Sequence, residues 1–204
     1  MDLISCILAP DLFGAQMVDS DQPVFLPPQE DVLVAKAAPK RRREFALGRA
    51  CARAALSALG HGDAVIGRHD NGAPHWPDGV VGSITHTSGY AAALVADMSC
   101  FSGVGLDAER VGGVTSNLWP RLFDAEECDA LERLDEQDRK LAATLFFSAK
   151  EASYKAWGMK TALSFREIHV IQGEGCGFTA TRSGEILKGR FAVQDDLLLA
   201  AVWR

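Results

Sequence analysis

The chain has 204 residues, 48% of them hydrophobic and 24% charged, which excludes a disordered protein and allows one compact domain or two small ones. Its formal net charge of -6 argues against a general nucleic-acid-binding protein. Five scattered cysteines indicate neither a zinc site nor a complete disulfide framework, and without a basic leader or a membrane-length apolar run we expect a cytoplasmic protein with no membrane anchor.

The N-terminal part of the chain predicts one strand and one long helix. The first 38 residues hold short apolar runs broken by acids and prolines, which predict an early strand and loops. A helix follows over residues 40–59, where apolar side chains recur with helical spacing. On a second shared face lie Arg42, Arg49 and Arg53. One face of this helix can pack against a core while the other meets an anion.

The middle of the chain predicts extended structure. Residues 80–86 read as a strand end or loop entry, and residues 90–96 and 102–109 as two strands joined by a short turn. This hairpin would carry Asp107 and Glu109 at its far end, near the end of the first segment. The polar residues would then collect at one place.

The C-terminal part predicts helices followed by strands. Asp124 and Glu127 have the spacing of a capping box, and residues 137–157 form a second long helix. Each half therefore combines helix with antiparallel sheet, which predicts an α+β fold divided near residue 100. The strands expected in the tail are 167–172, 177–182, 187–193 and 197–203.

Two clusters of acids and lysines indicate phosphoryl chemistry. Asp107 and Glu109 lie two apart on a strand and so share a face, and Glu151 from the helix could add a third oxygen ligand for Mg²⁺. Lys150 and Lys155 would bring positive charge to a pyrophosphate beside the metal. Taken alone, the acid pair is more often a solvated strand edge, and Glu151 with Lys155 a surface ion pair worth about 0.2–0.5 kcal/mol.

The remaining polar residues have two interpretations each. His86 and Thr85 end a strand, where they can be structural hydrogen-bonding groups or donors to a phosphate oxygen. The arginines of the first helix can be a solvated face or a focused anion site. Neither signal decides the matter by itself.

The order of these segments along the chain is more specific than any one of them. Together they resemble the 4′-phosphopantetheinyl transferase superfamily, in particular its Sfp-type enzymes and their enterobactin-synthetase-activating branch. Residues 40–170 carry the resemblance. Its elements are Gly-Arg49-x-x-x-Arg53, Gly72-Ala-Pro74 with Trp76-Pro77, Gly82-Ser-Ile-Thr-His86, Gly-Leu-Asp-Ala-Glu109, and Lys-Glu151 with Lys155.

The resemblance implies an enzyme that moves the 4′-phosphopantetheine group of coenzyme A to a serine of an apo acyl, peptidyl or aryl carrier protein. The reaction releases adenosine 3′,5′-bisphosphate and needs Mg²⁺. The implied fold is a pseudo-dimer of two similar halves, each a small antiparallel sheet packed with a long helix. We expect residues 1–100 to contact the 3′-phosphate and pyrophosphate, and residues 101–204 to hold the acids and the catalytic helix. A pseudo-dimer is expected to act as a monomer.

By motif match, the resemblance makes Asp107, Glu109 and Glu151 the metal ligands. Glu151 also matches the position proposed in the family as general base, and that second role stays open. The catalytic residues would be Glu151, Lys155 and His86, with Lys155 clamping the pyrophosphate. For the 3′-phosphate we expect Arg49 and Arg53 with one of Arg41 or Arg42. The full set of coenzyme A contacts assigned in this way is Arg42, Arg49, Arg53, Arg68, Thr85, His86, Lys150 and Lys155.

The chain departs from the family pattern at Ala73, where many relatives carry a lysine. Glu127 matches an acid found near the metal in some relatives, but capping is its competing role. The sequence does not locate the surface that docks the carrier protein, and the four candidates for it are Leu118, Trp119, Met159 and Lys160.

Two other functions compete with the transferase. One is a Mg²⁺-dependent nucleotide phosphohydrolase with water as nucleophile, and the other is a non-catalytic binding module for coenzyme A or a carrier protein. By analogy with the enterobactin branch, the transferase would serve siderophore or other secondary metabolism.

Overall fold

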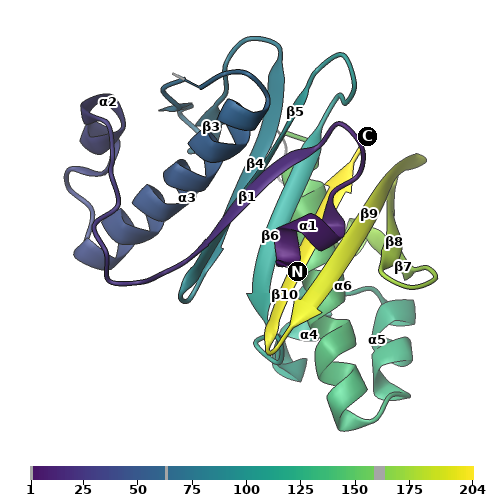
Figure 1. Ribbon diagram of the computed structural model, residues 1–204. Helices are drawn as coiled ribbons and strands as arrows, with labels where there is room; N and C mark the ends of the chain where they lie inside the picture. The colour runs from purple at the N-terminus through teal and green to yellow at the C-terminus, as the bar shows by residue number, and fades with distance from the viewer. Residues whose placement is uncertain (1, 63, 159–163) are drawn as a thin grey trace.

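The computed structural model describes residues 2–62, 64–158 and 164–204. Two antiparallel sheets, of three and five strands, stand side by side, each packed with one long helix (Figure 1), and the described residues also form a small two-stranded sheet. Up to residue 100 the elements are α1 (Leu3–Ile7), β1 (Phe13–Val18), α2 (Pro28–Asp31), the 3₁₀ helix η1 (Val32–Val34), α3 (Pro39–Ala58), β2 (Gly67–Arg68), β3 (Pro74–His75), β4 (Val80–Thr87) and β5 (Tyr90–Asp97).

The second half begins with the strand that carries the acid pair. Its elements are β6 (Val104–Arg110), η2 (Ser116–Leu118), α4 (Trp119–Leu122), α5 (Ala125–Glu132), α6 (Glu136–Ala156), η3 (Phe165–Glu167), β7 (His169–Gln172), β8 (Gly177–Arg182), β9 (Glu185–Gln194) and β10 (Leu197–Trp203). The mixture of helix and antiparallel sheet confirms the predicted α+β class. Among the described residues, no helix combines the length and apolar character that a membrane crossing requires.

Strand β5 is the centre of the first sheet, whose order is β1-β5-β4. Ala91 and Ala93 share a core with α3, whereas Ala92 and Leu94 share a core with the second sheet. Both faces of β5 are therefore covered, which explains why it reads as a continuous apolar run instead of an alternating one. Small side chains let the two halves approach closely on this strand.

The second sheet has the order β6-β10-β9-β8-β7. Helix α6 packs on one face through Ala149, Ala152 and Ala156. Helix α1 lies over β9 and β10, so the first residues of the chain cross to the second sheet (Figure 1). The boundary predicted near residue 100 falls between β5 and β6.

Strands β4 and β6 lie next to each other but belong to different sheets. Two hydroxyl groups connect them. The backbone N–H of Leu106 donates to Ser83 Oγ at 3.0 Å, and that of Ala108 donates to Thr85 Oγ1 at 3.0 Å. Residues 83 and 85 point the same way because they lie two apart on a strand. The two hydroxyl oxygens thus accept hydrogen bonds that, within a sheet, backbone carbonyl groups of a neighbouring strand would accept.

The predicted hairpin between residues 90–96 and 102–109 is wrong. Both segments are strands, but β5 pairs with β1 and β4, and β6 pairs with β10. The physical reason is that both edges of β5 are already occupied, so β6 must find its partner in the other sheet. The four tail strands, the two long helices and the Asp124–Glu127 capping box are confirmed, whereas helices α1 and α2 were not expected.

Candidate active site

Three carboxylates gather where β6 meets α6. Asp107 and Glu109 share the β6 face turned towards the helix, and Gly105 on that face permits unusually close packing. A Cβ atom at Gly105 would lie 1.8 Å from the Ala152 carbonyl oxygen. Only glycine fits here. The glycine therefore brings the backbone of α6, and with it Glu151, up to the acid-bearing strand.

Asp107 is the most enclosed of the three acids, with 5% of its surface exposed. Lys155 Nζ donates to its Oδ1 at 2.8 Å and to the Leu106 carbonyl at 2.9 Å. Ser148 Oγ donates to Oδ2 at 3.0 Å, and Thr85 Oγ1 lies 3.4 Å from Oδ1. Side chains from β4 and α6 therefore fix this carboxylate in a single orientation.

The surroundings of Glu109 and Glu151 disfavour the ionised form of both carboxylates. Burial, followed by the neighbouring charge of Asp107, raises the pKa of Glu109 to about 7. The same causes raise the pKa of Glu151. Three carboxylates with one lysine leave an excess of negative charge, and oxygen donors of this kind suit a hard divalent cation such as Mg²⁺. The donor set fits the predicted metal.

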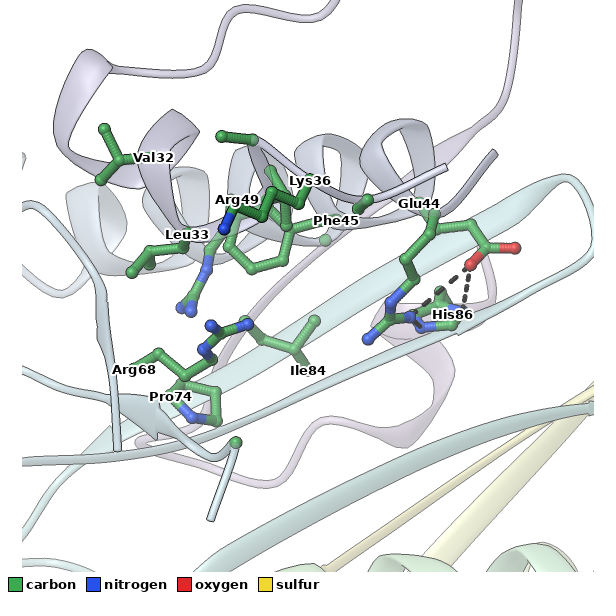
Figure 2. A pocket seen from close by; sticks show the side chains of 16 residues that line it. Val32, Leu33, Lys36, Glu44, Phe45, Arg49, Arg68, Pro74, Ile84 and His86 are labelled. Atoms are coloured by element: carbon green, nitrogen blue, oxygen red, sulfur yellow. Dashed lines mark hydrogen bonds and ion pairs between the residues drawn. The ribbon is translucent and has the colours of Figure 1, made fainter. Parts of the chain in front are cut away.

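A cavity of about 590 Å³ lies in the first half, between η1, α3 and β4 (Figure 2). Arg49 lines it with 3% of its surface exposed, and Nη2 donates to the Gly67 carbonyl at 2.8 Å. Its Nε and Nη1 have no hydrogen-bond partner among the described residues. Burial, opposed by Glu30 and reinforced by Arg53 and Arg68, lowers the pKa of Arg49 to about 10. Buried donors without acceptors are costly, so this site fits an anion.

Other cations and one histidine line the same cavity. Arg68 extends towards Arg49 across it, and Lys36 lies at its rim (Figure 2). Arg41 Nη1 lies 2.5 Å from His86 Nε2, and Glu44 is 3.9 Å from His86 Nδ1. Burial and the charge of Arg41 lower the pKa of His86. A neutral imidazole that accepts from an arginine is therefore expected at neutral pH.

Two predicted phosphate contacts are placed elsewhere. Arg42 forms an ion pair with Asp31 at 2.5 Å and does not line the cavity. Arg53 pairs with the fully buried Glu30 and donates to the Phe25 carbonyl at 2.8 Å. Residues 25–31 therefore neutralise these two arginines, and the phosphate contacts predicted for Arg42 and Arg53 stay predictions.

Lys150 and Thr85 also have structural partners in place of the predicted phosphate. Lys150 is fully buried and bonds to Glu127 and, at 2.9 Å, to the Leu122 carbonyl. The hydroxyl of Thr85 faces β6, as described above. Both side chains thus have partners within the protein, and their assignment as coenzyme A contacts stays a prediction.

Glu127 belongs to a cluster of its own with Asp124 and His169. Among the described residues, this is the one group of three potential ligands whose atoms lie within 4.8 Å of one another; the oxygens of the triad described above are spread more widely. Glu127 accepts from Lys150 and from the N–H groups of Asp124 and Val170. Lys150 therefore supplies the positive charge here, and Glu127 acts as a cap and a buried ion-pair partner.

A second cavity of about 760 Å³ lies between the halves, beside Lys155 and Trp157. It shares Gly72, Pro74 and Ile84 with the first cavity. The two cavities therefore adjoin at these residues; Arg49 lines the first, and Lys155, which contacts Asp107, lines the second. We call the two adjoining cavities the trough below.

Sequence reasoning missed two residues of the site. Ser148 lies three residues before Glu151, so helical periodicity could have found it on the same side of α6. Lys36 follows a short helical segment that the sequence analysis read as loop, and its position carries no sequence signal. Ser148 therefore lies on the helix that carries the motif, whereas Lys36 comes from the segment before α3.

The structure describes two of the four residues predicted to dock the carrier protein. Leu118 is 38% exposed, whereas the Trp119 ring is buried against Phe123, which makes the prediction for Trp119 wrong. Met159 and Lys160 lie outside the described residues.

Each half of the molecule matches a different family model. A model of the 4′-phosphopantetheinyl transferase N-terminal domain matches residues 29–96, and a model of the 4′-phosphopantetheinyl transferase superfamily matches residues 103–202. The 4′-phosphopantetheinyl transferase Npt of Nocardia iowensis is 39% identical over 98% of this chain and 99% of its own.

More distant proteins are similar over smaller shares. Enterobactin synthase component D of Salmonella typhimurium is 35% identical over 80% of this chain and 72% of its own. The solved holo-(acyl-carrier-protein) synthase of Bacillus anthracis, in complex with CoA (3′,5′-ADP), has a TM-score of 0.45 and 22% identity over 50% of this chain and 95% of that one.

Proposed function

Because the chain belongs to the 4′-phosphopantetheinyl transferase superfamily, we propose that it transfers the phosphopantetheine group of coenzyme A to a serine of an apo carrier protein. The observation that carries the proposal is the trough. One of its two cavities is lined by Arg49 with its unpaired buried donors, and the other by Lys155, whose ammonium contacts Asp107 of the acid cluster. A ligand with a phosphate at one end and a pyrophosphate further along matches that spacing of charge.

The cationic end is proposed to hold the 3′-phosphate of coenzyme A. Arg49 offers two nitrogens without partners, and Arg68 and Lys36 line the same cavity. Hydrogen bonds between charged groups are roughly twice as strong as neutral ones, and a guanidinium matches the geometry of phosphate oxygens. Arg41 and His86 lie further along the cavity, where they can meet the pyrophosphate.

The acidic end is proposed to hold Mg²⁺ through Asp107, Glu109 and Glu151. When bound, this ion would neutralise charge on the pyrophosphate as the phosphoanhydride breaks. Lys155 is held near Asp107 and can donate to the departing phosphate of adenosine 3′,5′-bisphosphate. We assign Glu151 to metal binding first, because a cation lowers the pKa of its carboxylate and makes it a weaker base.

The division of labour follows the two halves. Residues 1–100 supply the cationic contacts, and residues 101–204 supply the acids and α6. Both ends of the trough come from one chain, so we propose that a monomer is active. An apo carrier protein for siderophore or other secondary metabolism is the proposed acceptor, in keeping with the enterobactin relatives.

The test is the intact mass of several apo carrier proteins after incubation with this protein, coenzyme A and Mg²⁺. A gain of one phosphopantetheine, lost in Asp107→Ala and in EDTA, is the expected result. Nucleotide hydrolysis without any gain on the carriers would favour a phosphohydrolase. Coenzyme A binding without either reaction, indifferent to Mg²⁺ and to Glu151→Gln, would favour a binding module.

A further inference from the structure

We propose that the hydroxyl groups of Thr85 and Ser148 position the carboxylate of Asp107 for metal binding, so that each half of the molecule contributes one hydroxyl. These are positioning residues, since they act through Asp107. The inference rests on the metal role that the proposed function gives to Asp107.

Ser148 lies on α6 and is fully buried. Its Oγ donates to Asp107 Oδ2 at 3.0 Å, and this oxygen has no other hydrogen-bond donor among the described residues. The helix that carries Glu151 therefore also fixes the orientation of the Asp107 side chain. Two predicted ligands on different elements are thereby tied together.

Thr85 acts from the opposite side, on β4, and is 4% exposed. Its Oγ1 accepts from the Ala108 N–H at 3.0 Å, which leaves the hydroxyl hydrogen for Asp107 Oδ1 at 3.4 Å. A hydroxyl has one donor and two acceptor sites, so both contacts can form together. One side chain thus fixes the β6 backbone and the carboxylate it carries.

Hydroxyls suit this task better than a further lysine. A lysine orients a carboxylate but also neutralises it, and would compete with a cation for the same oxygens. A hydroxyl donates a hydrogen bond without adding charge. Two hydroxyls on Asp107 therefore restrict its orientation without adding to the positive charge that Lys155 already brings to Oδ1.

Two nearby serines provide matched controls. Ser153 lies on the same helix as Ser148 and is equally buried, but donates to the Ala149 carbonyl of its own helix at 2.7 Å. Ser83 connects β4 to β6 as Thr85 does, but contacts only the Leu106 backbone. Each control loses a buried hydroxyl without losing a contact to the carboxylate.

The experiment is an electron paramagnetic resonance titration of Mn²⁺ into the protein bound to coenzyme A, with no carrier protein present. We expect Ser148→Ala and Thr85→Val each to weaken Mn²⁺ binding about 10-fold, as losses around metal ligands commonly do. Ser153→Ala, Ser83→Ala and the hydroxyl-preserving Thr85→Ser should match the wild type. Coenzyme A affinity measured without metal should be the same in all six proteins, and circular dichroism checks that each is folded.

The outcomes separate the two proposals. If the wild type binds Mn²⁺ but Ser148→Ala and Thr85→Val bind it as tightly as their controls, the positioning role is overturned and the transferase stands. If the wild type binds no Mn²⁺, the metal assignment itself fails and takes the positioning role with it. If Thr85→Val does not fold, Ser148→Ala against Ser153→Ala decides the question.

Discussion

The cationic cavity and the acid cluster are built in different ways. The acids come from β6 and α6, two adjoining regular elements whose backbones are brought together at Gly105. The arginines come from one face of α3, but their guanidinium groups go to different places. A short carboxylate side chain stays close to its backbone, whereas the position of a long arginine's guanidinium group depends on the acid with which it pairs.

The acids that pair with the arginines lie before α3, in the loop after β1 and in the short helix α2. Asp19 pairs with Arg43, and Asp31 with Arg42. Arg49 has no such acid, and its Nε and Nη1 are left without partners among the described residues. The acids around each arginine, and not its position on the helix, therefore decide which cation is available to a ligand.

The largest effect is expected at the acidic end. Glu151→Gln should lower kcat roughly 1000-fold, because metal-centred charge stabilisation is worth several kcal/mol. The KM for coenzyme A should change little, since the cationic end is untouched. Steady-state kinetics against the exposed-acid control Glu132→Gln provides the measurement. A mainly KM effect would show that the acid cluster binds coenzyme A and does not act on its reaction.

The next largest effect is expected on stability. Arg53→Met leaves the carboxylate of Glu30 buried without its cation, and breaking such a pair costs about 3 kcal/mol. Thermal unfolding should show this loss, and Arg53→Met combined with Glu30→Gln should recover much of it. If instead Arg53→Met is stable and raises the KM for coenzyme A, Arg53 contacts the phosphate after all.

Regular elements account for what the sequence could predict. Period-two spacing on β6 and four-residue spacing on α6 place Asp107, Glu109, Glu151 and Lys155 without knowledge of the rest of the fold. The pairing of β6 with β10 was not predictable, because strand partners depend on which edges are already occupied.

Side-chain partners account for much of what could not be predicted. Lys150 lies next to Glu151 in the motif from which phosphate contacts were predicted, yet its ammonium is buried against Glu127, 23 residues away in sequence. Arg49 and Arg53 are one helical turn apart and were equivalent in sequence. Only the position of Glu30 separates them, and that residue lies in a segment with little regular pattern.

A moderate effect is expected when Arg49 is removed. Arg49→Met should raise the KM for coenzyme A about 10- to 100-fold with kcat nearly unchanged, because a hydrogen bond to a charged group contributes about 1.5–3 kcal/mol. Wild-type enzyme with 3′-dephospho-coenzyme A should show the same loss. The variant should not discriminate between the two substrates. If the variant still loses affinity when the 3′-phosphate is removed, so that the effects of the two changes multiply, Arg49 does not contact the 3′-phosphate.

The smallest effect is expected at Arg42, which shares a helix face with Arg49 in sequence. Its guanidinium pairs with Asp31 on a half-exposed surface, where such pairs contribute about 0–1 kcal/mol. Arg42→Ala should therefore leave the KM for coenzyme A within a factor of two, and unfolding should change by less than about 1 kcal/mol. Measured beside Arg49→Met, this variant tests whether the acids decide which arginine contacts coenzyme A. A KM increase equal to that of Arg49→Met would mean that coenzyme A draws Arg42 away from Asp31, and that helical position outweighs the acids.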